Sequence, residues 1–131
     1  MITMDTCAII WDALEPTKLS AKAKNAIKKA NDSNELLMCD ISIWEISMLI
    51  KKKRLVIDAT AAGFVNLLLQ SRNFHVQAIT PEIASLSVDF GPEISSDPAD
   101  RLIAATSIVM RTPVVTADRA LRDTAVVETI W

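Results

Sequence analysis

The apolar positions along the chain follow two alternating patterns. Five short apolar runs, bounded by polar or turn-forming residues, have the length of buried β-strands. These runs span residues 2–4, 36–39, 74–79, 113–116 and 126–130. Longer stretches with helical spacing predict helices over residues 20–30, 42–51, 59–70, 80–88 and 97–111. Strands that alternate with helices predict an α/β fold with a mostly parallel central sheet.

Several of the predicted helices begin with residues that favour helix N-termini. Ser20 is expected to cap the helix that follows it. Ser42 and Glu45 have the spacing of a capping box, in which an acid follows a serine by three positions. Asp97 is placed to cap a helix that begins at Pro98, because proline suits the first helical position.

Four acidic residues occupy related places in this pattern. Asp5 follows the first strand and Asp118 follows a late one, whereas Glu45 and Asp100 lie near the starts of helices. Strand ends and the helix starts that follow them lie on one edge of a parallel α/β sheet, where ligands bind. We therefore hypothesise that the four carboxylates converge on one crevice, although the sequence does not give the strand order.

Most of these acids also have a structural interpretation. Asp100 would be favoured by the helix dipole in the first turn of its helix. Glu45 fits a capping box, and Asp118 fits a helix cap or a turn. Asp97 is interpreted as a cap more readily than as a ligand. Asp5 has the weakest structural explanation, so its position favours a role in metal binding.

Convergence of the four carboxylates would require a cation. Two unit charges ~4 Å apart at an effective dielectric of ~20 repel by about 4 kcal/mol. A hard divalent ion such as Mg²⁺ or Mn²⁺ takes oxygen ligands, and it suits phosphate chemistry because it activates water and stabilises a leaving oxygen. Thr6 and Thr116 are predicted to hydrogen-bond the carboxylates, or alternatively to finish their strands.

Composition limits the remaining classes of protein. The chain has 131 residues, half of them apolar, which predicts a single domain over residues 1–131. Neither a signal peptide nor a membrane span is expected, so we predict a cytoplasmic protein. Cys7 and Cys39 have no metal-binding spacing and are interpreted as buried free thiols.

The net charge of −2 gives no general sign of nucleic-acid binding. Binding to a polyanion would need a bridging cation or a local basic patch. The run from Lys51 to Arg54 is one candidate patch, although cations at a helix C-terminus also fit a solvated helix end. Trp11, Trp44 and Trp131 are interpreted as core or interface residues.

The motifs together resemble PIN-domain ribonucleases of the VapC toxin type. The resemblance covers nearly the whole chain and rests on several fragments in the expected order. These fragments are residues 2–8, 41–49, 96–105, 114–121 and 127–131. The resemblance implies a three-layer α/β/α sandwich and an endoribonuclease that depends on Mg²⁺ or Mn²⁺. It places the family's acidic quartet on Asp5, Glu45, Asp100 and Asp118.

The resemblance also implies partners and RNA contacts. Such toxins usually pair with a small antitoxin protein and usually form homodimers. The sequence departs from close relatives at Ser95-Ser96, where His-Arg is common, and at Lys51-Lys52-Lys53, where a glycine is common. The candidate contacts to the RNA backbone are Arg101, Arg119, Lys51, Lys52, Lys53 and Arg54.

Other interpretations of the acids fit less well. A phosphoacceptor receiver needs paired acids after the first strand and a late lysine, which Asp5-Thr6 and Asp118-Arg119 do not supply. A haloacid-dehalogenase-like phosphatase needs an aspartate where Cys7 stands. Two alternatives stay open: a PIN nuclease of RNA processing without an antitoxin, and a catalytically silent PIN-fold interaction domain.

Overall fold

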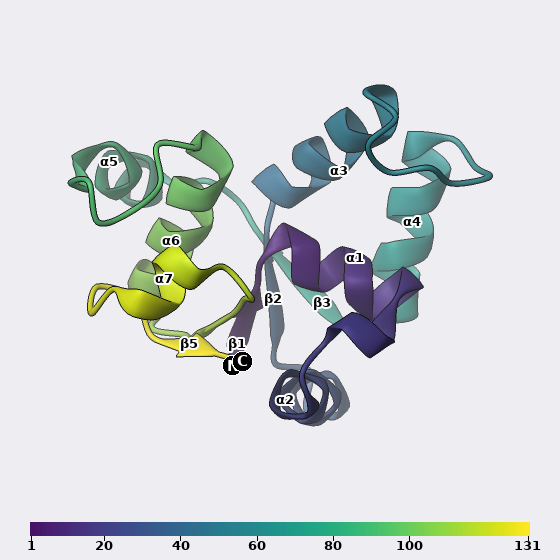
Figure 1. The fold of residues 1–131 in the computed structure, drawn as a ribbon, viewed down its shortest axis with the longest axis horizontal. Helices are drawn as coiled ribbons and strands as arrows, with labels where there is room; N and C mark the ends of the chain where they lie inside the picture. Colours follow the sequence, from purple (N-terminus) through teal and green to yellow (C-terminus); the bar gives the residue numbers. More distant parts are fainter.

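The computed structural model describes residues 1–131, and Figure 1 shows how its helices and strands are arranged. The strands are β1 (Ile2–Met4), β2 (Leu36–Cys39), β3 (Phe74–Gln77), β4 (Val114–Val115) and β5 (Thr129–Ile130). The helices are α1 (Thr6–Leu14), α2 (Ala21–Asp32), α3 (Ile41–Lys51), α4 (Ala61–Ser71), α5 (Pro81–Asp89), α6 (Pro98–Met110) and α7 (Arg119–Asp123). A short 3₁₀ helix, η1 (Pro16–Lys18), joins α1 to α2. None of the helices is both long and apolar enough to cross a membrane.

The five strands form one sheet in the order β3-β2-β1-β4-β5, and every neighbouring pair is parallel. The sequence predicted a mostly parallel sheet, and the sheet is parallel throughout. β1 pairs with β2 on one side and with β4 on the other. The chain therefore changes direction across the sheet between β1 and β4, and this topological switch point is where such folds place ligands.

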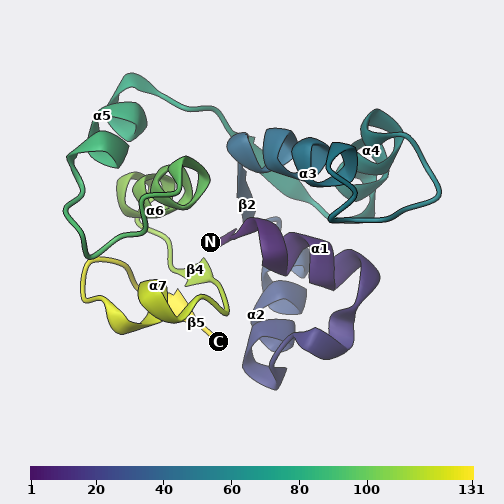
Figure 2. The ribbon, with the colours of Figure 1, turned by 45° about the horizontal axis from the view of Figure 1, so that its top comes forward.

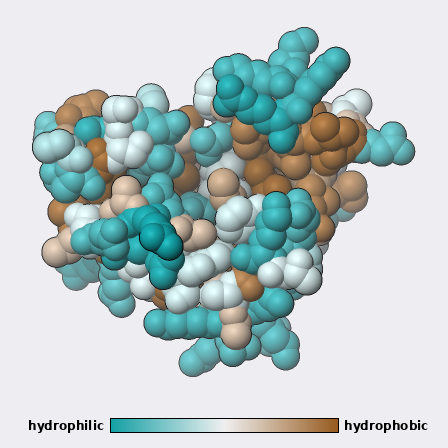
Figure 3. Space-filling view, in the orientation of Figure 1, coloured by the Kyte–Doolittle hydropathy of each residue, from teal (hydrophilic) through white to brown (hydrophobic).

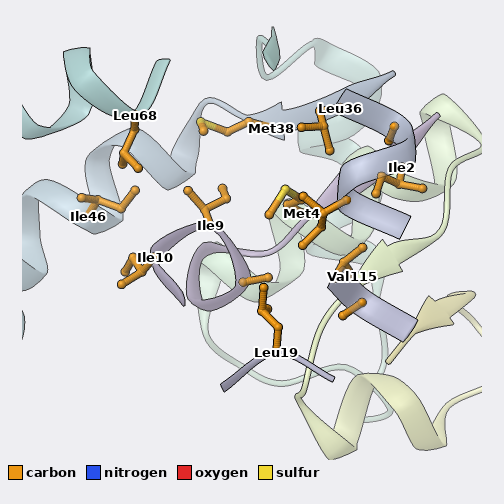
Figure 4. Close-up of a cluster of buried hydrophobic side chains, with 14 of the residues drawn as sticks. Ile2, Met4, Ile9, Ile10, Leu19, Leu36, Met38, Ile46, Leu68 and Val115 are labelled. Carbon is orange, nitrogen blue, oxygen red and sulfur yellow. The ribbon is translucent and has the colours of Figure 1, made fainter. Parts of the chain in front are cut away.

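Helices cover both faces of the sheet, so the fold is the predicted three-layer α/β/α sandwich. Figure 2 shows α1 to α4 on one side of the strands and α5, α6 and α7 on the other. Successive strand residues point to opposite faces. Ile2 and Met4 accordingly pack into the larger apolar cluster with α1, α2 and α4, drawn in Figure 4. Cys39 and Val114 pack instead with Ile103 of α6 in a second cluster.

Two helix starts differ from the expectation. A helix over Thr6–Leu14, α1, stands where the apolar pattern predicted no helix, and the Asp5 side chain caps it. Helix α3 begins at Ile41, one residue before the predicted capping serine. Ser42 is fully buried, and its hydroxyl lies 3.0 Å from the hydroxyl of Thr6. The capping-box interpretation of Ser42 and Glu45 is therefore wrong, because a tertiary hydrogen bond uses the serine.

Candidate active site

An open pocket of about 400 Å³ lies at the carboxyl ends of β1 and β4. All four predicted acids line it, although they are spread over the length of the chain. The lining residues are Asp5, Thr6, Cys7, Trp11, Glu45, Leu49, Asp100, Ala117 and Asp118. We call this the acidic pocket. Its position at the switch point explains why residues from four separate segments meet there.

Asp5 and Asp118 are held in the acidic pocket by the helices that they cap. One carboxylate oxygen of Asp5, Oδ1, accepts a hydrogen bond of 2.7 Å from the backbone N–H of Ala8. Oδ1 of Asp118 accepts one of 2.8 Å from the N–H of Ala120. Each cap uses Oδ1 and leaves Oδ2 free of that bond. The structural and chemical interpretations of these two acids are therefore compatible.

Glu45 and Asp100 enter the acidic pocket from α3 and α6. The hydroxyl of Thr6 lies near Glu45 and that of Ser95 lies near Asp100, and each opposes the rise in the pKa of its neighbouring carboxyl. Asp97 caps α6, as predicted, by accepting from the N–H groups of Ala99 and Asp100 at 2.8 and 3.2 Å. Since Asp97 already satisfies the helix terminus, the carboxylate of Asp100 is not needed as a cap.

The two threonine hydroxyls that were predicted to hydrogen-bond the carboxylates both lie near them. The fully buried Thr116 hydroxyl lies near the carboxylate of Asp5 and opposes the rise in the pKa of that acid. The same oxygen accepts a hydrogen bond of 3.0 Å from the backbone N–H of Asp118. Thr116 thereby holds the backbone of Asp118, and its hydroxyl stays close to Asp5.

Burial, with a contribution from crowding, raises the pKa of three carboxyl groups in the acidic pocket. Burial raises the pKa of Asp5 to about 6, and repulsion by Asp118 and Glu45 adds to the shift. Burial and the neighbouring Asp97 raise the pKa of Asp100 to about 6. The pKa of Glu45 is also raised, mainly by burial. A cation in the acidic pocket would oppose these shifts by stabilising the ionised forms.

The Cys7 thiol lies within electrostatic reach of all four acids. Partial burial of the thiol, in a residue that is exposed as a whole, raises the pKa of Cys7 to about 11, and all four carboxylates contribute to the rise by repulsion. The thiol therefore stays protonated at neutral pH. Cys7 and Cys39 are both free, as predicted, but only Cys39 is buried. Cys7 is exposed because it points from the first turn of α1 into the acidic pocket.

The acidic pocket suits a hydrated divalent cation better than a tightly enclosed one. Its charged donors are carboxylate oxygens, which Mg²⁺ and Mn²⁺ prefer. The side chains do not draw together into a compact set of three or more ligands. Mg²⁺ needs no such cage, because it usually binds through one or two carboxylates and keeps several waters. The residues therefore fit a metal such as Mg²⁺.

The raised pKa values predict that the metal-free protein loses stability as pH rises from about 4 to about 6. In this window the unfolded chain releases its protons before the folded protein does, so ionisation favours unfolding. Asp100→Asn removes one such group. We expect this variant to be more stable than the parent at pH 7 by on the order of 1 kcal/mol, and equal to it near pH ~4. Urea unfolding in EDTA at both pH values measures the difference, and a large loss of stability at pH 7 would contradict it.

The predicted RNA contacts are not brought together. Lys51, Lys52, Lys53 and Arg54 are exposed at the far end of α3 and do not line the acidic pocket. Lys51 lies about 9 Å along the helix axis from Glu45. In Figure 3 this end of α3 forms a hydrophilic area at the top of the molecule, above a hydrophobic area over α3 and α4. Arg119 is exposed and lines a neighbouring hollow.

Arg101 has a structural role in place of the predicted RNA contact. Its guanidinium donates hydrogen bonds to four backbone carbonyls in α5 and the loop that leads to α6. The acceptors are Ser95 at 2.9 Å, Ser87 at 3.1 Å, Phe90 at 2.9 Å and Gly91 at 3.3 Å. These bonds direct the guanidinium into the loop, so we do not include Arg101 among the proposed RNA contacts.

Sequence reasoning missed some residues around the acidic pocket. Trp11 and Leu49 form its apolar walls, which helical spacing alone does not distinguish from core positions. Trp44 is exposed, so of the two expected roles, core or interface, only the interface role fits its position. Asp40 also follows a strand, as Asp5 does. Its Oδ2 accepts a hydrogen bond of 3.3 Å from the N–H of Ile79 beyond β3, away from the acidic pocket.

The fold and the acidic pocket define a class: parallel α/β domains with carboxylates gathered at the switch point. The PIN domain matches residues 2–127 of the chain. Ribonuclease VapC22 of Mycobacterium tuberculosis (strain ATCC 25618 / H37Rv) is 33% identical over 123 residues, which cover 92% of this chain and 89% of that protein. The chain therefore belongs to the PIN-domain family, among its VapC-type members.

Solved structures of low sequence identity share the fold. A toxin–antitoxin complex from Klebsiella pneumoniae aligns with a TM-score of 0.68 and 20% identity. VapBC2 from Rickettsia felis, bound to a DNA fragment from their promoter, aligns with a TM-score of 0.73 and 13% identity. Each alignment covers 98% of this chain and 97% of the other chain. These likenesses support the three-layer architecture along the whole chain.

Proposed function

We propose that the chain, as a single PIN domain over residues 1–131, is a metal-dependent endoribonuclease. Mg²⁺ or Mn²⁺, when bound, would activate water for attack on an RNA phosphodiester and stabilise the leaving oxygen. Asp5, Glu45, Asp100 and Asp118 would hold the ion directly or through water. The observation that carries the proposal is the meeting of these four acids in one pocket at the switch point.

The chain's own residues would prepare this site before RNA binds. Caps on α1 and α7 fix Asp5 and Asp118, and the Thr116 hydroxyl, which accepts from the N–H of Asp118, lies near Asp5. The Thr6 hydroxyl contacts buried Ser42 and lies near the carboxylate of Glu45. Carboxylates held in this way need little reorganisation to bind a cation. Such preorganisation is the main protein contribution to metal-assisted catalysis.

We further propose that this nuclease is the toxin of a toxin–antitoxin pair in the cytoplasm. The mycobacterial relative, named a ribonuclease VapC, and the fold shared with toxin–antitoxin complexes support this proposal. A small antitoxin protein would be its partner, and a homodimer is the expected assembly. A small open reading frame beside the gene would favour the toxin over an RNA-processing PIN nuclease.

The direct test is cleavage of single-stranded RNA by the purified chain with Mg²⁺, with Mn²⁺ and with EDTA. We expect internal cleavage with either ion and none in EDTA. Cleavage that persists in EDTA would contradict the metal mechanism. Failure to cleave any RNA with either ion, by a chain that is folded and binds RNA, would favour the catalytically silent domain.

A further inference from the structure

A second hollow, of about 430 Å³, adjoins the acidic pocket and has the opposite charge. It lies between the beginning of α2, the helix α7 and strand β5. Its lining residues are Lys22, Arg119, Arg122, Asp123, Thr129 and Trp131. We call it the basic hollow. Three cations face one carboxylate there, in a protein whose net charge is −2.

The cations of the basic hollow have no partners in the protein. Lys22, Arg119 and Arg122 are exposed, and none of them takes part in a salt bridge or a side-chain hydrogen bond. Other cations of the chain differ: Arg72 pairs with Asp12 at 2.9 Å, and Arg101 is bound to backbone carbonyls. The three free cations are therefore available to an anion from solution. Figure 3 shows a strongly hydrophilic area over α7 on the face toward the viewer.

The acidic pocket and the basic hollow share a boundary. Asp118 lines the first and Arg119, the next residue, lines the second. Trp11 lines the acidic pocket and Trp131 lines the basic hollow, and their ring centroids are 5.9 Å apart. A chain of phosphates that passes over the acidic pocket can therefore continue into the basic hollow.

We infer that the basic hollow binds a backbone phosphate of single-stranded RNA next to the phosphodiester held over the acidic pocket. This inference rests on the proposed nuclease function and names its substrate path. Lys22 from α2 and Arg119 and Arg122 from α7 supply the phosphate contacts. Because they contact phosphates and not bases, they strengthen binding without selecting a sequence.

Affinity for a labelled oligouridylate tests the inference in the Asp5→Asn background, where the probe stays intact with Mg²⁺ present. We expect Lys22→Ala and Arg122→Ala each to weaken binding about fivefold near 0.1 M salt and to reduce the slope of log affinity against log salt by about 0.7. Lys28→Ala, which removes an exposed cation from the same helix as Lys22, should change neither quantity.

The outcomes separate this inference from the nuclease proposal. If Lys22→Ala and Arg122→Ala bind the probe as Lys28→Ala does, the inference is overturned, whether or not the parent cleaves RNA. If the two variants weaken binding while the parent cleaves nothing, the phosphate-binding role of the basic hollow is supported and the nuclease proposal is contradicted. If Lys22→Ala and Arg122→Ala weaken the binding of a polyglutamate peptide but not the binding of the oligouridylate, the inference is overturned in favour of an acidic protein partner.

Cleavage kinetics of the otherwise native chain give a second readout. In an active nuclease, Arg122→Ala should raise KM for the oligouridylate and leave kcat unchanged, because the lost contact acts on binding alone. A dinucleotide that reaches only the acidic pocket should show no change. An equal effect on both substrates would contradict the assignment of a separate phosphate site.

Discussion

Asp5→Asn is expected to reduce kcat/KM for RNA cleavage by about 1000-fold, which corresponds to about 4 kcal/mol of transition-state stabilisation. Asparagine has nearly the same shape but lacks the negative charge that a divalent cation requires. The site also holds Glu45, Asp100 and Asp118, so the loss measures one ligand among four. Cleavage of a labelled RNA over a range of Mg²⁺ concentrations measures the effect.

The same variant should fold normally, because the structural role of Asp5 survives the substitution. An asparagine oxygen can accept the 2.7 Å hydrogen bond from the Ala8 N–H, and asparagine caps helices as well as aspartate does. Asp5→Ala removes the cap as well and should lower the free energy of unfolding by about 1 kcal/mol. Comparing the two variants separates loss of charge from loss of the cap.

A matched control removes an acidic charge elsewhere. Glu128→Gln alters an exposed carboxylate outside the acidic pocket and should leave cleavage unchanged. Activity of Asp5→Asn near that of the parent would mean that Asp5 serves only as the cap of α1. The proposed metal mechanism would then lose its most enclosed ligand.

Two of the four acids show how one side chain can serve both the fold and the site. In a parallel α/β fold, the residue after a strand often caps the next helix, and that same position faces the ligand crevice. Asp5 and Asp118 follow this rule with one oxygen each. A sequence-based choice between cap and ligand was therefore a choice between two roles that the geometry allows together.

The sequence was most informative where local signals agreed with the tertiary structure. The cap at Asp97, the proline at the start of α6 and the apolar strands β1 and β2 are all local features, and the structure confirms them. Strand order is not local, because it depends on which apolar faces pack together. Predicting that the acids meet at the switch point therefore required either the fold or the family resemblance.

The errors arose where distant residues compete for a polar group. Ser42 looked like a helix cap, but its buried hydroxyl contacts Thr6, so α3 begins one residue earlier. The basic hollow escaped notice because Lys22 and Arg122 are 100 residues apart in sequence and meet only in the folded protein. Arg101 looked free in the sequence because its partners are backbone carbonyls, which no residue type reveals.

Arg101→Ala is expected to lower the free energy of unfolding by about 3 kcal/mol. The guanidinium donates to carbonyls of Ser87, Phe90, Gly91 and Ser95, and so joins the end of α5 and the following loop to α6. Hydrogen bonds from a charged donor are worth about 1.5–3 kcal/mol each, but water can reach some of the released carbonyls, so the losses do not add. Urea unfolding of both proteins measures the change.

A comparison with Arg119 shows which role each arginine has. Arg119→Ala removes an exposed cation with no partner in the protein and should change stability by less than about 0.5 kcal/mol. It should instead reduce the salt dependence of RNA binding, as Lys22→Ala and Arg122→Ala are expected to do. Arg101→Lys keeps the charge but not the forked geometry, so it should recover only part of the stability. If Arg101→Ala unfolded like the parent but lost RNA affinity, the loop contacts would be unimportant and the original prediction of an RNA contact would be restored.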